Sequence, residues 1–282
     1  TLVAKEDTNI THDTHISHGA LLYWQNKPKR AARLTAHVGY CVPITSCAAS
    51  HPSNDFAYPG GLAAFGFQDG RISIINTLSG KTLFCVENED TQGVQHRRSN
   101  SSNNDNNAFA ISAVAFSSDN RLIVGQQGTD ILLWVLPSGE TCYRLPTTGS
   151  TAFSMCGNGN MSSDMLLVGN ASGYVSLWHV ATPLNTMEDL QLVSENYHGS
   201  NVGITATACS SNSPFVVSGN KQGVVVIWRI EQGGIIKNAT IGHSYRTPIT
   251  SLSFRTDGQR IAVSSTGDPT VKVFDVHGSP VF

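Results

Sequence analysis

Residues 249–265, ITSLSFRTDGQRIAVSS, contain two alternating apolar runs separated by Thr-Asp-Gly. Asx and glycine residues tolerate the positive φ that tight hairpin turns require, so this stretch predicts a β-hairpin. Residues 111–127, ISAVAFSSDNRLIVGQQ, repeat the pattern around a Ser-Asp-Asn turn. After each hairpin comes a third apolar run with an aromatic at a fixed place, Phe274 in DPTVKVFD and Trp134 in GTDILLWV. A fourth run, such as KTLFCVE or ETCYRLP, completes a unit of four predicted strands.

This unit recurs along the whole chain of 282 residues. The marked aromatic or large apolar positions are Trp24, Ile75, Trp134, Trp178, Trp228 and Phe274. Their spacing matches the roughly 40 to 50 residues of a four-stranded propeller blade once loop insertions are allowed. We therefore expect an all-β fold, a β-propeller of four-stranded antiparallel blades, within a single domain over residues 1–282.

About six blades are visible, five fuller units and one partial unit around Trp24, whose first strand is absent. Residues 249–276 supply three strands of the last unit, and residues 279–282 are too short for a clear fourth. An open propeller leaves unpaired strand edges. Closure therefore calls for a six-bladed ring, for residues outside this chain, as in a seven-bladed ring, or for strands from a partner.

Three dipeptides carry a resemblance to a known family. Ala36-His37 and Gly242-His243 resemble the Gly-His element of WD40 repeats, and Phe274-Asp275 resembles their Trp-Asp ending. The resemblance implies a structural hydrogen-bond network of His, Ser/Thr, Asp and Trp beneath the blade surface, incomplete in every unit here. The members it assigns are His37, Asp69, His243, Ser265 and Asp268.

Composition narrows the function classes. A net charge of −2 gives no general attraction to nucleic acid or anionic membrane, so we expect no direct nucleic-acid binding. No apolar run approaches the roughly 20 residues needed to cross a bilayer, so we expect no transmembrane segment. The six cysteines are dispersed and have apolar neighbours, which favours free thiols in the cytoplasm, with the nucleus as the alternative. Five N-x-S/T sequons point the other way, but chance matches are expected in a chain rich in Asn, Ser and Thr.

Three segments depart from the repeat. Residues 87–108 form a polar, low-complexity insertion that we expect to be disordered, either a tolerated surface loop or a regulatory segment. His12, His15 and His18 have the spacing of a metal site, but a hairpin loop is the favoured interpretation, and we assign no metal or cofactor. Residues 26–34, NKPKRAARL, predict a solvated hairpin tip more than a phosphate-binding patch.

The sequence favours a protein-interaction scaffold or adaptor within a larger multiprotein complex over an enzyme. We find no GxSxG, Walker, HExxH or CxxC motif, although propeller enzymes can place catalytic residues on separate blades. The alternative is therefore a propeller enzyme or lectin-like protein that uses the central channel. Tyrosine and arginine are typical interface anchors. The partner-binding candidates in predicted connections are Tyr40, Tyr197, His198, Tyr245 and Arg246.

Overall fold

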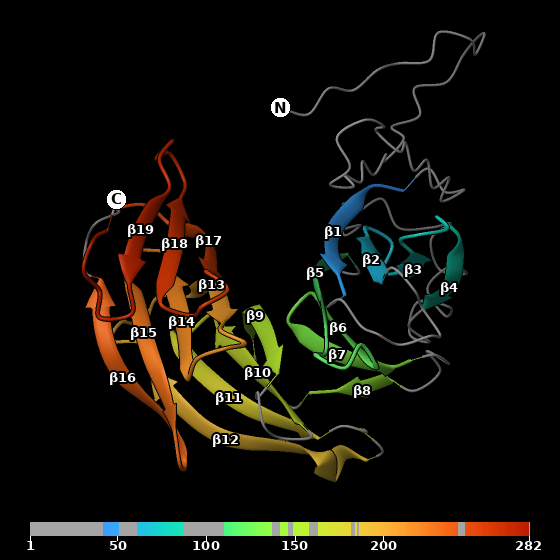
Figure 1. The fold of residues 1–282 in the computed structure, drawn as a ribbon, viewed down its shortest axis with the longest axis horizontal. Helices are drawn as coiled ribbons and strands as arrows, with labels where there is room; N and C mark the ends of the chain where they lie inside the picture. The colour runs from blue at the N-terminus through green and yellow to red at the C-terminus, as the bar shows by residue number, and fades with distance from the viewer. Residues whose placement is uncertain are drawn as a thin grey trace, which may run out of the picture.

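The computed structural model describes residues 42–50, 61–86, 110–136, 142–145, 149–157, 163–181, 184, 186–241 and 246–281. Within these ranges the chain forms five antiparallel sheets whose strands follow one another in sequence order. Figure 1 shows the sheets following one another in chain order, with the first and last at the two ends of the series.

The first two sheets have four strands each. The first contains β1 (Ile44–Ala49), β2 (Leu62–Phe67), β3 (Ile72–Asn76) and β4 (Thr82–Val86). The second contains β5 (Ile111–Phe116), β6 (Leu122–Gln127), β7 (Asp130–Val135) and β8 (Cys142–Arg144).

The next two sheets also have four strands, and the last has three. The third contains β9 (Ser150–Gly157), β10 (Ser163–Asn170), β11 (Tyr174–Ala181) and β12 (Leu190–Tyr197). The fourth contains β13 (Ile204–Cys209), β14 (Phe215–Asn220), β15 (Val225–Glu231) and β16 (Gly234–Ile241). The fifth contains β17 (Ile249–Phe254), β18 (Arg260–Ser265) and β19 (Lys272–Asp275).

The predicted all-β blades are therefore confirmed, but the predicted count of six is not. Five sheets are present in the described ranges, and the unit around Trp24 lies outside them. The last unit has the three strands that its sequence predicted. The insertion at 87–108, the histidines at 12, 15 and 18, and residues 26–34 also lie outside the described residues.

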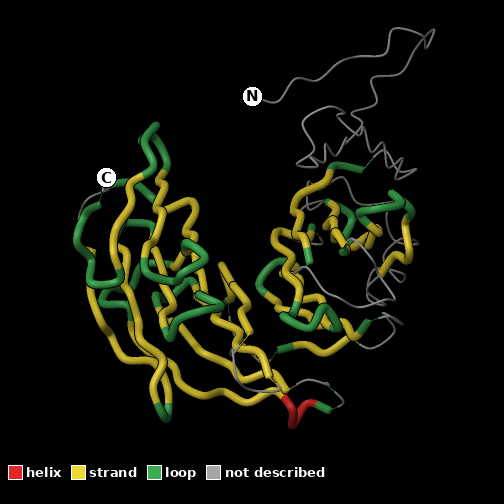
Figure 2. The backbone as a smooth tube through the Cα atoms, in the orientation of Figure 1, coloured by secondary structure: helices red, strands yellow, loops and turns green. Residues whose placement is uncertain are grey.

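Helix is nearly absent from the described part of the chain. It is represented there by the three-residue 3-10 helix η1 (Met187–Asp189), drawn red at the lower edge of Figure 2. No helix in these residues is long and apolar enough to cross a membrane.

The hairpin turns form where the sequence predicted them. Asn120, in the Ser-Asp-Asn turn between β5 and β6, has a φ of 60°, and Gly258, in the Thr-Asp-Gly turn between β17 and β18, has a φ of 67°. Gly258 is constrained a second way, because a Cβ there would collide with the hydroxyls of Ser210 and Ser213 in the connection between β13 and β14. This turn therefore also sets the spacing between the last two sheets.

The marked residue of each described repeat lies on the third strand of its sheet, and its side chain is buried. Exposure is 1% for Ile75, 1% for Trp134, 6% for Trp178, 2% for Trp228 and 4% for Phe274. The last four each belong to a core cluster that also contains residues of the preceding sheet. The repeat aromatics therefore hold neighbouring sheets together through burial of large apolar surfaces.

A hydrogen bond recurs between neighbouring inner strands. We call the first strand of each sheet its inner strand. In three sheets, the threonine at the second position of the inner strand donates its hydroxyl hydrogen to the backbone carbonyl of the first residue in the inner strand of the next sheet. The pairs are Thr45 with Ile111 at 2.5 Å, Thr151 with Ile204 at 2.5 Å and Thr205 with Ile249 at 2.6 Å.

A glycine on the second strand makes room for each of these isoleucines. A Cβ at any of these glycines would collide with the isoleucine side chain, and the three are Gly66, Gly169 and Gly219. The threonine hydroxyl, the glycine and the isoleucine together fix how each of these sheets meets the next.

Candidate partner-binding surface

Two of the predicted partner-binding residues, Tyr197 and His198, lie at the end of β12, where the chain crosses to the fourth sheet. Tyr197 is opposite Tyr174 in the register of β11 and β12, and the ring centroids are 5.2 Å apart with an interplanar angle of 49°. Both side chains remain exposed, Tyr174 at 39% and Tyr197 at 44%. The structure therefore places an exposed aromatic pair where the sequence indicated a single tyrosine.

Residues 198–203, which follow the pair, are held against both neighbouring turns. The backbone N–H of His198 donates to the Gly173 carbonyl at 2.9 Å, and the Lys221 N–H donates to the Gly203 carbonyl at 3.0 Å. Gly173 has a φ of 83°, and a Cβ there would collide with the Ser200 carbonyl. This connection is therefore fixed by the turns β10–β11 and β14–β15.

Side-chain hydrogen bonds complete the surface. The Tyr197 hydroxyl donates to Asn201 Oδ1 at 3.1 Å, and Asn220 Nδ2 donates to Ser200 Oγ at 3.2 Å. The side chains of Asn201 and Lys221 are exposed beside this connection. We call Tyr174, Tyr197, Asn201 and Lys221 the rim surface.

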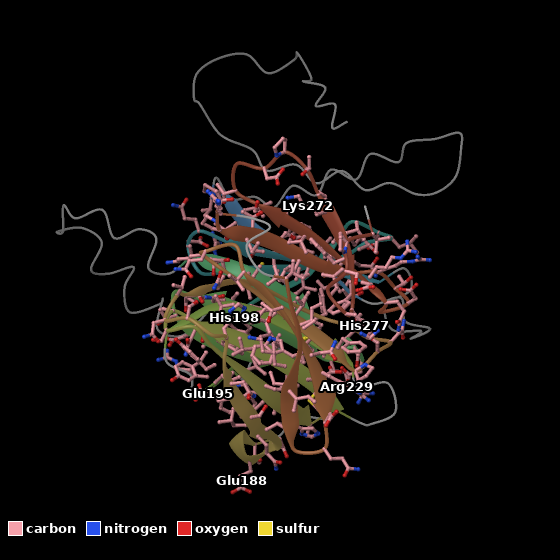
Figure 3. The ribbon with its side chains drawn as sticks, turned by 90° about the vertical axis from the view of Figure 1, so that its left-hand side faces the viewer. Glu188, Glu195, His198, Arg229, Lys272 and His277 are labelled. Atoms are coloured by element: carbon pink, nitrogen blue, oxygen red, sulfur yellow. The ribbon has the colours of Figure 1, made fainter. Side chains whose placement is uncertain are left out.

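His198 lies beneath the rim surface and not on it. Its side chain is 2% exposed, its Nε2 is 3.2 Å from the Ser218 carbonyl, and its ring centroid is 6.3 Å from that of Trp228. Trp228 Nε1 donates to Ser218 Oγ at 2.8 Å. A buried imidazole cannot anchor a partner without leaving the core, so His198 is a structural residue, labelled in Figure 3.

This trio is a hydrogen-bond network of the WD40 type that the sequence analysis did not assign. The spacing of its residues could have indicated this network. His198 precedes Trp228 by 30 residues, and His243, which the resemblance did assign, precedes Phe274 by 31 residues. The network lacks one member, since among the described residues His198 Nδ1 is buried with no hydrogen-bond partner. Asp69 and Asp268 stand six residues before Ile75 and Phe274, and the residue six before Trp228 is Gln222, so no carboxylate is present at that position to complete the network.

The environment of His198 favours its neutral form. The pKa of His198 is lowered from 6.5 to about 4, mainly by burial and to a smaller extent by the nearby Lys237 ammonium, while the bond to the Ser218 carbonyl acts in the opposite direction. A neutral ring that donates from Nε2 leaves Nδ1 as an acceptor, and that acceptor is the unpartnered atom.

The residues assigned to the network by resemblance have other partners. Asp69 accepts a hydrogen bond from Arg71 Nε at 2.7 Å. Ser265 is 6% exposed and its hydroxyl accepts from Thr247 Oγ1 at 3.3 Å. Asp268 accepts from the Thr270 N–H at 2.9 Å and pairs with Lys272 Nζ at 3.3 Å. Hydrogen bonds from Thr270 lower the pKa of Asp268.

The network expected in the fifth sheet is not seen among the described residues. There, no hydrogen bond joins Ser265 to Asp268, and His37 and His243 lie outside those residues.

The remaining predicted partner-binding residues are not brought to the rim surface. Arg246 is exposed in the connection between β16 and β17. Tyr40 and Tyr245 lie outside the described residues. Within the described ranges, no group of three or more His, Cys, Asp or Glu side chains could hold a metal ion.

A second concave feature lies at the other end of β11 and β12. It is an open groove of about 800 Å³ between these strands and the β15–β16 hairpin. Its polar side includes the Arg229–Glu231 ion pair at 3.7 Å. Figure 3 shows Arg229 lower on the molecule than His198, towards Glu188. The rim surface and the groove therefore occupy opposite ends of the third and fourth sheets.

Comparisons with known proteins agree with this architecture. The family model described as WD domain, G-beta repeat matches residues 191–229 and 236–275. A search of the curated proteins finds no match. Among solved structures, the crystal structure of the computationally designed Ika8 protein is similar, with 20% sequence identity and a TM-score of 0.54. The match covers 85% of this chain and 60% of that chain, and at this identity it shows the fold alone. Residues 191–229 and 236–275 therefore match two WD40 repeats, and together with the successive antiparallel blades they support a WD40-repeat β-propeller family for this chain.

Proposed function

We propose that this chain is a non-enzymatic protein-interaction scaffold or adaptor, a subunit of a larger complex, and that it binds a partner through the rim surface. WD40 propellers are generally scaffolds of this kind. The observation that carries the proposal is the exposed pair of Tyr174 and Tyr197 on a connection held by both neighbouring turns.

Two exposed aromatic rings side by side are suited to binding a protein. Tyrosine buries a large area with few rotatable bonds and keeps a hydroxyl for hydrogen bonding, so it is enriched among interface residues that dominate affinity. The fixed connection at 198–203 reduces the ordering cost of association. The exposed side chain of Lys221, beside Gly203 of the same connection, suits a partner whose apolar anchor is flanked by acidic residues.

We place the scaffold in the cytoplasm or the nucleus. The cysteines Cys47, Cys85, Cys156 and Cys209 are free thiols in the structure, and two of them, Cys47 and Cys85, are exposed. Exposed free thiols are typical of proteins kept in a reducing compartment.

Affinity purification of the tagged chain from its source cells tests the proposal. Replacing both Tyr174 and Tyr197 with alanine should remove specific co-purifying proteins while the melting temperature stays close to that of the wild type. Leu192→Ala is the matched control, because Leu192 is a 50% exposed apolar residue on the same strand but outside the rim surface. Unchanged recovery with the double variant would count against the rim surface as the binding site.

A further inference from the structure

The inner strands of the third and fourth sheets each carry a cysteine near their last residue. Cys156 is on β9 and Cys209 ends β13. Cys156 is 4% exposed within the core cluster between the two sheets, and Cys209 packs against the same cluster. The two side chains therefore approach each other from neighbouring sheets.

The contacts of Ser154 place Cys209 against the face of β9 that also carries Cys156. Cys209 Sγ is 3.2 Å from Ser154 Oγ and 3.7 Å from the Ser154 carbonyl oxygen. Ser154 and Cys156 are alternate residues of β9, so they share a face about 7 Å apart along the strand. Each of the two thiols shifts the pKa of the other, as expected for neighbouring groups.

The environment gives the two thiols different roles. Hydrogen bonds from Cys156 and from Ser154 stabilise the Cys209 thiolate and lower the pKa of Cys209. The same interaction, together with burial, raises the pKa of Cys156. Cys209 is partly exposed and Cys156 is buried, so an oxidant from solution meets Cys209 first.

We propose that Cys156 and Cys209 form a reversible disulfide that links the third and fourth sheets under oxidising conditions. The oxidant is a small-molecule disulfide of the glutathione class. The Cys209 thiolate attacks one of its sulfur atoms, which forms a mixed disulfide and releases one small thiolate. The Cys156 thiol then loses its proton and attacks the Cys209 sulfur, which releases the second small thiolate. Two protein thiols are oxidised and one small disulfide is reduced to two thiols.

The bond would join strands on either side of one inter-sheet interface. Cys209 lies 53 positions after Cys156, and the segment between them contains β10, β11 and β12. A crosslink across so long a segment restricts the unfolded chain more than the folded one. The oxidised protein should therefore unfold at a higher temperature than the reduced protein.

The test uses the full chain with Cys41, Cys47, Cys85 and Cys142 replaced by serine, so that Cys156 and Cys209 are its two remaining cysteines. The protein is incubated with glutathione disulfide, alkylated under denaturing conditions, digested and analysed by mass spectrometry. The expected product is a crosslinked peptide pair containing Cys156 and Cys209, lost on treatment with dithiothreitol. The melting temperature should rise by about 5 °C on oxidation. Peptide mapping of the wild-type chain, with all six cysteines, provides the same readout if the serine variant does not fold.

Two further variants separate the roles of the thiols. Cys156→Ser should stop at a mixed disulfide on Cys209, whereas Cys209→Ser should react at least about tenfold more slowly, because the buried Cys156 thiol is then the target. Recovery of both cysteines as free thiols would overturn the proposal. A mixed disulfide on Cys209 that never resolves in the presence of Cys156 would overturn it equally.

Discussion

Thr205 donates its hydroxyl hydrogen to the Ile249 carbonyl at 2.6 Å, and the Ile249 side chain lies over Gly219 of the same sheet as Thr205. The two contacts join the inner strand of the fourth sheet to that of the fifth. Thr45 and Thr151 make the same bond to their following sheets, so one local device sets three of the inter-sheet contacts. The threonine and glycine positions are therefore constrained by packing between blades.

Thr205→Val should lower the free energy of unfolding by about 1 kcal/mol, because it removes one hydroxyl while keeping the side-chain shape. Thr207→Val on the same strand is the control. Among the described residues, the Thr207 hydroxyl is buried with no hydrogen-bond partner, so its removal should be neutral or stabilising. Urea unfolding of both variants gives the comparison, and equal losses would show that the hydrogen bond contributes nothing.

Gly219→Ala should destabilise the protein by about 1–3 kcal/mol, because the added Cβ would lie 2.7 Å from Ile249 Cγ2. Ile249→Ala removes two of the three nearest atoms, Cγ2 and Cγ1, and leaves only Cβ close to the added group. The double variant should therefore lose less stability than the sum of the two single variants. Additive losses in thermal or urea unfolding would contradict the direct contact.

Trp228→Phe should cost about 1 kcal/mol more than Trp134→Phe. Both indoles are almost fully buried, at 2% and 1% exposure. Trp228 Nε1 donates to Ser218 Oγ at 2.8 Å, whereas Trp134 Nε1 has no hydrogen-bond partner in the described part of the chain. Urea unfolding measures the difference, and a larger loss at Trp134 would contradict the assigned network.

Stability should fall on acidification from about pH 6.5 to pH 4. The pKa of His198 is lowered from 6.5 to about 4 in the folded state, so the unfolded chain binds more protons throughout this window. The loss attributable to His198 approaches about 3 kcal/mol below pH 4 and is absent above pH 7.

Chemical unfolding at several pH values checks this dependence. His198→Gln should flatten the slope between pH 4 and 6.5, although the variant starts from a lower stability. His277→Gln is the control for loss of a histidine, because His277 is exposed in the turn after β19. An unchanged slope in His198→Gln would rule out this residue as the source.

The sequence predicts the local elements of this fold because its signals are local. Alternating apolar runs, Asx-Gly turns and the recurring aromatic gave the strands, the hairpins and the buried positions of Trp134, Trp178 and Trp228. The blade count depends on contacts between distant segments, and the predicted six was not confirmed.

The candidate site was harder to predict, because it depends on register and packing between sheets. Tyr174 meets Tyr197 only through the pairing of β11 with β12, which is shifted by an irregularity between Leu177 and Trp178. His198 is buried because residues 198–203 pack on the turn that contains Gly173. His198 and Gly173 are 25 residues apart, so the sequence around either residue does not predict their contact. The likeness of its spacing to that of His243 and Phe274 was the one available signal.

The affinity of an identified partner for the wild-type chain and for the variant with Tyr174→Ala and Tyr197→Ala tests the central claim most directly. The dissociation constant should rise at least about tenfold in the double variant, as expected for loss of two interface anchors, and should stay within about twofold for Leu192→Ala. A double variant that folds normally and binds the partner as tightly as the wild type would contradict the rim surface as the binding site.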